Sequence, residues 1–406
     1  MLIVTMYFPP AAGGGAQRPL KLAAHLPSLG VETHVLTPDD AKWVQRDETA
    51  RPPPAAHVHR VRNCGPRTRL RGREVEAARG AGRLFAECRM LPRRALVPDA
   101  EIVWALAAIP AAVQLVRRHA IDVVMTTSPP ASLHLVGAAA RRLTAARWIA
   151  DLRDPIVSSP FRRAELRGEL ALGRLIARRA DAVIAASGGI ADEIRGLGCT
   201  GEVAVIQNGC DAEDFEGLTY QAADHFRITH TGSFLSRRDP RPFLEALRLS
   251  SADIVARFVG DFRSSDLAYA REIGVRDRIV PMAFVPRREA LALQRNSEAL
   301  LLLVPDAKGR GRAVLTAKLF EYLAARRPIL AAVPVDGEAA RLLRPTGAAT
   351  IVSPDDVTGM TAALADFELR WRTGVLNVPP LSPELQAGLS GRAVAEGVAA
   401  VVRSLA

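Results

Sequence analysis

The chain has 406 residues, of which 49% are hydrophobic and 24% charged, close to the average for soluble globular proteins. This composition excludes disordered and fibrous proteins, and the length predicts two or three domains. The formal net charge is +11, and residues 1–212 carry 29 Lys and Arg against 20 Asp and Glu. A basic half suggests an anionic partner, such as nucleic acid, a lipid headgroup or a phosphorylated substrate.

The sequence shows no pattern typical of a membrane-spanning helix, a signal peptide, or a disulfide or metal site built from cysteines. The longest apolar run, residues 102–116, contains Pro110 and Gln114 and is shorter than the ~20 residues of a membrane-spanning helix. The chain opens with an apolar stretch that has no basic segment before it, which predicts a first strand rather than a signal peptide. The four cysteines form no CxxC pair, so no disulfide or metal framework is expected. We expect a cytoplasmic protein.

Short β-branched runs alternate with helical patterns along the whole chain, which predicts βαβ units and parallel sheets. Strands are predicted at residues 2–5, 32–36, 58–61, 122–126, 147–151, 182–186 and 203–206, and then at 227–231, 256–259, 278–282, 299–304, 329–332 and 348–351. Helical patterns between the strands include residues 18–29 and 166–179. The segment 208–226 has few strand or helix signals and indicates a linker. The sequence thus predicts two doubly wound α/β domains, residues 1–212 and 213–381.

Ligands of open parallel sheets bind beyond the carboxyl ends of the strands, at a topological switch point. Two motifs in the first domain follow predicted strands in this way. Gly13-Gly14-Gly15 comes after the first strand and before a helix, where glycines let a ligand approach the backbone and the helix N-terminus favours an anion. The motif is not GxGxxG, and no acidic residue ends the second strand, which disfavours a nicotinamide dehydrogenase. A surface turn is the alternative.

The second pair of strand ends in this domain carries hydroxyl and charged groups. The segment TTSPPASLH, which includes Ser128 and His134, offers hydroxyls that could bind sugar oxygens or cap the next helix. The segment DLRDP places Asp151, Arg153 and Asp154 after another strand, where they could orient an acceptor or polarise a leaving group. The alternative for DLRDP is an internal Arg–Asp bridge that holds the loop.

Two motifs of the second domain suit a diphosphate. The segment HTGSFLSRRDP combines a glycine turn with paired arginines, and guanidinium groups bind phosphate oxygens in bidentate fashion. In KLFEYLAARRPIL, Lys318 and Glu321 lie on one face near the start of a helix. Lys318 could hold phosphate and Glu321 could accept hydrogen bonds from a ribose diol. Solvated arginines and an i,i+3 surface ion pair are the alternatives.

Together these segments resemble the retaining nucleotide-sugar glycosyltransferases of the GT-B fold, specifically glycosyltransferase family 4. The matching pieces run in order from residue 7 to residue 330: YFPPAAGGGAQR, TTSPPASLH, DLRDP, VIQNGCDAEDF, THTGSF with RDPRPFLEAL, FVGD and KLFEYLAARRPIL. The resemblance implies two Rossmann-like domains that face each other across a cleft. It also implies transfer of a sugar from a nucleoside diphosphate to a hydroxyl acceptor.

The resemblance assigns roles to particular positions. Gly14 and Gly15 would lie near the donor diphosphate and sugar, and Arg237, Arg238 and Lys318 would neutralise the diphosphate. Glu321 would bind the ribose hydroxyls, and Asp151, Arg153 and Asp154 become candidates for the reacting centre. Further expected substrate-binding residues are Arg18, Ser128, His134, Asn208, Gly232, Ser233, Phe284, Val285, Leu319 and Phe320.

Two departures from the family pattern affect these assignments. Many relatives have a second glutamate eight residues before the ribose-binding one, where this chain has Ala313. Recognition of the sugar by that residue is therefore lost or is done by a neighbour such as Arg310 or Arg312. The histidine of the family's acceptor loop is also missing unless His134 replaces it. No paired carboxylates and no metal cluster stand out, and we expect catalysis without a metal or cofactor. A GT-B epimerase and a non-catalytic binding protein remain alternatives.

Two segments outside these motifs also have a distinctive pattern. Residues 60–94 contain 11 Arg and three Glu, and we predict an acceptor-side or membrane-facing surface there, with a solvated helix packed on the core as the alternative. No nucleic-acid partner is expected. Residues 382–406 repeat apolar positions every three or four residues, which predicts a helix that returns to the first domain.

Overall fold

The computed structural model describes residues 1–40, 45–65, 95–157, 163–234 and 239–405. These residues form two compact units. Unit 1 comprises the described residues up to Gly209 together with those from Leu389 onwards, and unit 2 comprises Cys210–Gly388. The division therefore lies at 209/210 and 388/389, beside the 212/213 and 381/382 boundaries that the sequence predicts. Most of the basic stretch 60–94 lies outside the described residues.

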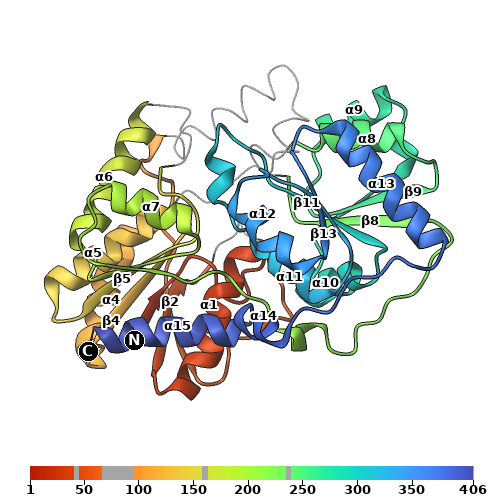
Figure 1. Cartoon of the computed structure of the whole chain (residues 1–406). Coiled ribbons are helices and arrows are strands. Elements are labelled where there is room, and N and C mark those ends of the chain that lie inside the picture. The colour runs from red at the N-terminus through yellow and green to blue at the C-terminus, as the bar shows by residue number, and fades with distance from the viewer. Residues whose placement is uncertain (41–44, 66–94, 158–162, 235–238, 406) are drawn as a thin grey trace. The chain divides into compact units, whose positions relative to one another are not determined.

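Unit 1 is built on a seven-stranded parallel sheet with the order β3-β2-β1-β4-β5-β6-β7 (Figure 1). Its strands are β1 (Leu2–Val4), β2 (Thr33–Pro38), β3 (Ala56–Val61), β4 (Val123–Ser128), β5 (Arg147–Leu152), β6 (Ala182–Ala185) and β7 (Glu202–Val205). Each strand begins and ends within two residues of its predicted bounds. For buried central strands such as β1 and β6 the prediction succeeds because they are continuous apolar runs bounded by turn residues.

Helices cover both faces of this sheet (Figure 1). They are α1 (Gly14–His25), α4 (Ile102–Arg118), α5 (His134–Leu143), α6 (Arg163–Arg179), α7 (Gly188–Gly196) and α15 (Gly391–Ser404), with short 3-10 turns η1 (Leu26–Leu29) and η2 (Ala131–Leu133). Alternate residues of β1 enter different cores, since Ile3 packs with α1 and α15, whereas Leu2 and Val4 pack with α4 and α5.

The C-terminal helix α15 belongs to unit 1 (Figure 1). Val394 and Val398 share a core with Leu22 and Ala23 of α1. The Ser390 hydroxyl accepts a hydrogen bond from the Ala393 N–H and caps the helix start. The segment before it forms a separate short helix, α14 (Pro383–Gly388), so the helical pattern that the sequence predicts over 382–406 is broken at residues 389–390.

Unit 2 is built on a six-stranded parallel sheet with the order β10-β9-β8-β11-β12-β13 (Figure 1). Its strands, again within two residues of the prediction, are β8 (Phe226–Thr231), β9 (Ile254–Val259), β10 (Ile279–Met282), β11 (Ala299–Leu303), β12 (Ile329–Ala332) and β13 (Ala349–Val352). The helices are α8 (Arg241–Leu249), α9 (Ser264–Glu272), α10 (Arg287–Arg295), α11 (Ala317–Ala325), α12 (Glu338–Leu343), α13 (Val357–Arg372) and α14, with 3-10 turns η3 (Ala212–Phe215), η4 (Arg276–Arg278), η5 (Arg310–Ala313) and η6 (Arg344–Thr346).

The two sheets share one connectivity. If the strands of each unit are numbered along the chain, both orders read 3-2-1-4-5-6, with one further strand in unit 1. This is the Rossmann order, in which the direction of winding reverses between the first and fourth strands. The switch points are therefore β1/β4 in unit 1 and β8/β11 in unit 2. The predicted α/β class with two doubly wound domains is confirmed.

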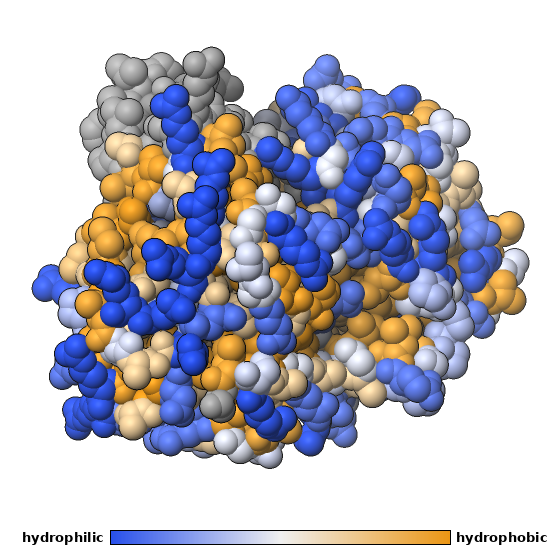
Figure 2. All heavy atoms as spheres, turned by 60° about the vertical axis from the view of Figure 1, so that its left-hand side comes forward, coloured by the Kyte–Doolittle hydropathy of each residue, from blue (hydrophilic) through white to orange (hydrophobic). Residues whose placement is uncertain are grey.

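The surface carries apolar and polar side chains side by side. Figure 2, in which unit 1 comes forward, shows hydrophobic patches broken up by hydrophilic side chains. No helix among the described residues combines the length and the apolar character that crossing a bilayer requires.

Candidate functional site

The glycine segment after β1 forms the start of α1 at the switch point of unit 1. Gly13 precedes the helix with a φ of 94°, a conformation that favours glycine, and Gly14 is exposed in the first turn. A Cβ atom on Gly15 would lie 2.8 Å from Cδ2 of Tyr7, so the absence of a side chain lets the helix start pack on that ring. The first turn of α1 contains no acidic residue, so no carboxylate there offsets the positive end of the helix dipole.

Arg18 of α1 and Asp151 at the end of β5 form a buried ion pair. The Arg18 Nη2 atom lies 2.9 Å from Oδ1 of Asp151, and the two side chains are 2% and 0% exposed. Arg18 also donates to the main-chain oxygens of Ile206 and Gln207, while the Thr127 hydroxyl donates to Asp151 Oδ2 at 2.7 Å. The pair is thus fully hydrogen-bonded and ties α1 to β4, β5 and the segment after β7.

The DLRDP segment therefore differs in part from its predicted role. Asp151 does take part in an Arg–Asp bridge, but its partner is Arg18 of α1, outside the segment, and not Arg153. Arg153 is buried and donates to the main-chain oxygens of Ser128 and Gly15, each at 2.7 Å. Burial lowers the pKa of Arg153, against the charges of Asp151 and Asp154. Asp154 is the exposed acid of the segment.

The hydroxyls of TTSPPASLH face inward. Thr126, Thr127 and Ser128 are all buried, and the Ser128 hydroxyl donates to the main-chain oxygen of Asp151 at 3.4 Å. Neither predicted use, sugar binding or a side-chain cap of α5, is what these contacts show, because the hydroxyls join β4 to β5 and to the core. A substrate contact by the Ser128 side chain would require it to leave this position.

His134 lies in the core of unit 1. It is 0% exposed, and its Nδ1 lies 2.8 Å from Oγ1 of Thr126, which also accepts from Trp148 Nε1 at 2.8 Å. Burial lowers the pKa of His134 to about 3, opposed by the charge of Asp151, so the ring is neutral. A buried neutral ring does not reach a ligand at the surface, which argues against His134 as a replacement for the family's loop histidine.

In unit 2, two glycine turns pack backbone against backbone at the carboxyl ends of β8 and β9. Gly232 and Gly260 have φ of 119° and 123°, and a Cβ atom on Gly260 would lie 2.9 Å from the carbonyl carbon of Gly232. The Ser233 hydroxyl accepts from the Asp261 N–H at 3.2 Å. Only glycine fits both the backbone conformation and the close approach. The turns hold the β8 loop in one shape.

Lys318 lies against this loop from α11. A Cβ atom on Gly232 would be 2.3 Å from Cε and 2.6 Å from Nζ of Lys318, so the lysine side chain lies directly over the glycine. Lys318 is the second residue of α11, whose N-cap Thr316 makes no side-chain cap. The ammonium group, the glycine turn and the positive end of a helix thus meet at the switch point of unit 2, which is a favourable arrangement for an anion.

Glu321 lies one turn further along α11 and is held by two side chains of α10. Arg287 Nη1 lies 2.5 Å from Oε1, and Gln294 Nε2 donates to Oε2 at 3.1 Å. Arg287 also pairs with Asp214 at 2.9 Å. Burial lowers the pKa of Arg287, but the charges of Glu321, Cys210 and Asp214 outweigh it and raise the value. The Glu321 side chain keeps 14% of its surface exposed, and a carboxylate accepts about four hydrogen bonds.

Arg287 is a candidate residue of the donor site that the sequence motifs do not indicate. Its partners Asp214 and Glu321 are 73 and 34 residues away in sequence, so no local spacing signals the network. The sequence places Lys318 and Glu321 near the start of one helix, and both belong to α11. The carboxylate is nevertheless paired to α10 rather than standing alone.

The other predicted residues of unit 2 vary in accessibility. Leu319 and Phe320 are buried, and the Leu319 N–H donates to the Thr316 main-chain oxygen at 3.1 Å. Phe284 and Val285 are half-buried in the loop between β10 and α10. Ala313 ends the 3-10 turn η5, where Arg312 pairs with Asp336 at 3.1 Å.

The predicted roles of Arg237, Arg238 and Asn208 have no support from contacts in the described residues. Arg237 and Arg238 lie outside the described residues. Asn208 is half-buried in unit 1, directly before the boundary between the units. Their roles stay predictions.

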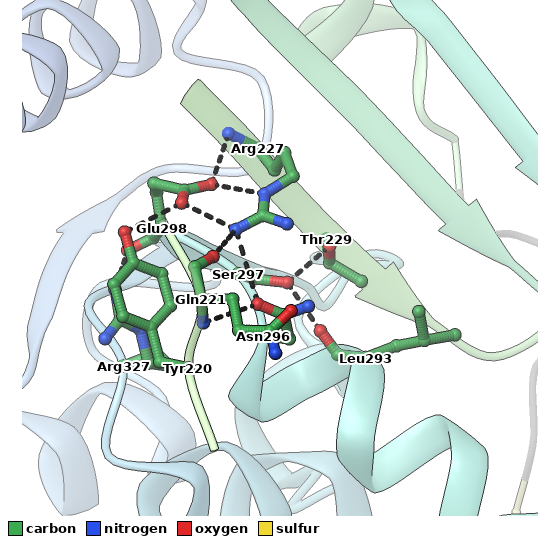
Figure 3. Close-up of polar contacts among 9 residues, drawn as sticks. All are labelled: Tyr220, Gln221, Arg227, Thr229, Leu293, Asn296, Ser297, Glu298 and Arg327. Atoms are coloured by element: carbon green, nitrogen blue, oxygen red, sulfur yellow. Dashed lines mark hydrogen bonds and ion pairs between the residues drawn. The ribbon is translucent and has the colours of Figure 1, made fainter. Parts of the chain in front are cut away.

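A second polar cluster of unit 2 lies at the opposite, amino end of its sheet. Arg227 at the start of β8 makes a bidentate pair with Glu298, with two N–O distances of 2.8 Å (Figure 3). The Tyr220 hydroxyl donates to Glu298 at 2.9 Å, and the Arg327 guanidinium carbon lies 4.0 Å from the centre of the Tyr220 ring (Figure 3). The cluster holds the linker onto the sheet. Its role is structural, because it lies away from the strand ends where ligands bind.

Comparisons with known proteins agree with this architecture. Residues 13–209 match the family model described as "Glycosyl transferase 4-like domain". Among solved structures, a sucrose-phosphate synthase from Thermosynechococcus elongatus is similar with a TM-score of 0.72 and 15% identity, covering 100% of this chain and 98% of the other. Anabaena HepE in complex with UDP and glucose has a TM-score of 0.65 and 15% identity, covering 99% of each chain. No curated protein matches the sequence.

Together, the two sheets and these comparisons define the class. The chain has the GT-B fold of glycosyltransferases, built from two Rossmann-like units. Residues 13–209 are similar to the glycosyl transferase 4-like domain. The GT-B fold, expected from the ordered motifs, is confirmed.

Proposed function

We propose that the chain is a retaining glycosyltransferase that moves a sugar from a nucleoside diphosphate to a hydroxyl acceptor, without a metal ion. The observation that carries the proposal is the position of Lys318 over Gly232, at the switch point of unit 2. Support comes from the family match of residues 13–209 and from the fold. HepE, a protein of similar fold, is described in complex with UDP and with UDP-glucose.

The donor would bind to unit 2. Lys318 and the start of α11 would hold the diphosphate, and Glu321 would accept hydrogen bonds from the ribose diol. Arg287 would orient the Glu321 carboxylate. The Thr316 hydroxyl at the N-cap of α11 is buried without a hydrogen-bond partner among the described residues, which is unusual for a native structure. A bound phosphate oxygen would supply that partner.

The reaction needs no base from the protein. As the bond between the sugar C1 and the phosphate oxygen breaks, its electron pair stays on that oxygen. The acceptor hydroxyl forms the new C1–O bond on the same face, and its proton passes to the departing phosphate. Lys318 would offset the negative charge that grows on the diphosphate, an interaction stronger in the transition state than in the ground state.

The acceptor would meet unit 1 near the strand ends that carry Gly14 and the DLRDP loop. Asp154 is the candidate there for direct contact, because it is exposed. Arg153 and the Arg18–Asp151 pair are buried, so they would position the loop rather than touch the substrate.

Two other functions stay in competition, an epimerase acting on nucleotide sugars and a binding protein without activity. An epimerase needs acid and base groups at the sugar, and Ala313 with its arginine neighbours supplies no carboxylate. A purified protein that slowly hydrolyses a nucleotide sugar is not a mere binding protein.

A thermal-shift screen tests the donor class. The protein is heated with UDP, GDP, dTDP or ADP, each at equal concentration, and the Tm is compared with that of the protein alone. We expect one of these to raise the Tm, because a ligand that binds the folded state stabilises it by mass action. No shift with any of the four contradicts the proposal.

We further propose that unit 1 contacts an anionic membrane surface. A groove on α4 and α5 is lined by apolar Ile109, Pro110, Val113 and Leu143 beside Arg117 and Arg118. Apolar side chains beside arginines suit a membrane with anionic headgroups.

Vesicle co-sedimentation tests this contact. Leu143 is 51% exposed, and the change Leu143→Glu should weaken co-sedimentation with anionic vesicles. The control Leu369→Glu changes a leucine of unit 2 that is 62% exposed and should have no effect. Equal binding by both variants, or none by the wild type, overturns the membrane contact.

A further inference from the structure

Half of the chain's eight histidines meet at one place in unit 1. His34 lies on β2, His57 and His59 lie on the neighbouring strand β3, and His119 follows the last residue of α4. The ring of His34 lies 4.8, 5.3 and 4.6 Å from those of His57, His59 and His119. The carboxylate of Glu32 completes the cluster, with Oε1 3.2 Å from Nε2 of His34.

Strand geometry brings these side chains together. In the parallel register, His34 pairs with His57 and Leu36 pairs with His59. Because side chains alternate between the faces of a strand, His57 and His59 share a face, which is also the face of His34. The C-terminal end of α4 then adds His119 from the helix layer. The cluster is thus held by two strands and one helix of the fold.

The ligand atoms lie close enough together for a metal ion to gather them. One nitrogen each from His34, His59 and His119 lies within 4.8 Å of the others, and His34 Nδ1 is 3.0 Å from His59 Nε2. Tetrahedral coordination with Zn–N bonds of about 2.0–2.1 Å places neighbouring nitrogens ~3.3–3.4 Å apart, so a pair at the 4.8 Å limit would have to close by ~1.4 Å on binding.

The hydrogen bond to Glu32 fixes the required tautomer. A carboxylate accepts, so His34 Nε2 carries the proton and its Nδ1 presents a lone pair toward His59. In protein metal sites, a histidine commonly donates to a carboxylate through one nitrogen and binds the metal through the other.

We propose that His34, His59 and His119 form a binding site for a divalent transition metal, with Glu32 orienting His34. Three imidazoles suit Zn²⁺, Cu²⁺ or Ni²⁺ rather than Mg²⁺ or Ca²⁺, which take oxygen ligands. The site lies at the amino ends of β2 and β3, opposite the strand ends where substrates of such sheets bind. Its role is therefore to join β2, β3 and α4, not to take part in sugar transfer.

Calorimetry with Zn²⁺ on the full chain, free of any histidine tag and treated with a chelator, tests the site. We expect one Zn²⁺ per chain and a higher Tm with metal. His119→Gln removes an exposed ligand and should weaken binding by about 100-fold or more, since even loss of a group that only orients a ligand costs ~10–100-fold. Glu32→Gln should weaken it by about 10–100-fold. Visible absorption of bound Co²⁺ should report tetrahedral coordination.

His225→Gln is the matched control, because His225 is an exposed histidine of unit 2. It should bind Zn²⁺ like the wild type, and the Tm of each variant without metal shows whether it folds. Three outcomes overturn the proposal: no stoichiometric binding by the wild type, unchanged affinity in His119→Gln, or loss of binding in His57→Gln with full retention in both His59→Gln and His119→Gln.

Discussion

Gly232 has two separate reasons to be glycine, and they can be tested apart. Its φ of 119° is strained for other residues, and a Cβ atom would displace the end of the Lys318 side chain. Gly232→Ala should lower the free energy of unfolding by ~1–3 kcal/mol and also weaken nucleotide binding. Gly374→Ala is the control, since Gly374 has a φ of 75° but nothing within 4 Å of an added Cβ. Gly374→Ala should lower the free energy of unfolding but leave the nucleotide affinity unchanged. Equal nucleotide affinity in both variants would mean that Lys318 does not hold the donor.

Glu321 takes part in an ion pair and, by the proposal, in ribose binding. Glu321→Ala should weaken nucleotide binding by ~1.5–3 kcal/mol per charged hydrogen bond lost and raise the donor KM, because the contact exists in ground and transition states alike. Asp214→Asn removes the other carboxylate partner of Arg287 and controls for loss of that network. Calorimetry with the preferred nucleotide compares them. If Asp214→Asn weakens nucleotide binding as much as Glu321→Ala does, the role of Glu321 is only structural.

The buried Arg18–Asp151 pair joins helix α1 to strand β5 of the unit 1 sheet. Asp151→Asn leaves the buried Arg18 charge without its counter-ion and should lower the free energy of unfolding by ~3–5 kcal/mol. Asp192→Asn, which removes the 77% exposed partner of Arg195, should cost less than ~1 kcal/mol. Denaturant unfolding of both variants measures this. An Asp151→Asn protein of full stability but no transfer activity would instead support a direct catalytic role for Asp151.

His134 makes the stability of unit 1 depend on pH. Its pKa is about 3 in the folded chain, because it is buried, against 6.5 when unfolded. Between these values the unfolded chain binds one more proton, so the free energy of unfolding falls by ~1.4 kcal/mol for each pH unit below 6.5. The raised pKa of buried Asp99 acts in the opposite direction.

The variant His134→Asn isolates this contribution, because Asn keeps a polar atom near Nδ1 but does not titrate. The difference in free energy of unfolding between wild type and variant should shrink from pH 6 to pH 4. A difference that stays constant over this range would show that His134 is not neutral in the folded protein.

The elements were predictable from sequence for a local reason. Runs such as Ala299–Leu303 are apolar throughout and are bounded by polar or turn residues, so a buried parallel strand is visible in five or six letters. The apolar spacing predicts one helix over residues 382–406, but the chain forms α14 and then a second helix, α15, that is capped by Ser390. A serine that caps the second start was the signal for this break.

For the molecule as a whole, the sequence motifs predict the GT-B fold but not which side chains pair with one another. Arg18 and Asp151 are 133 residues apart, and His34 and His119 come from elements that no spacing rule connects. One local signal for the histidine cluster was present, since His57 and His59 alternate along a predicted strand and so share one face. The order of segments along a chain shows its family more readily than its contacts, because contacts depend on sheet register and helix packing.

The central claim is that unit 2 holds a nucleotide-sugar donor through Lys318. The most direct test measures release of nucleoside diphosphate from UDP-glucose, GDP-mannose, dTDP-glucose and ADP-glucose, by the wild type and by Lys318→Ala. We predict slow hydrolysis of one donor by the wild type. Lys318→Ala should cut the rate ~10²-fold or more, while affinity for the nucleoside diphosphate falls much less. Equal rates and affinities in both proteins, or no hydrolysis of any donor by the wild type, would contradict the account.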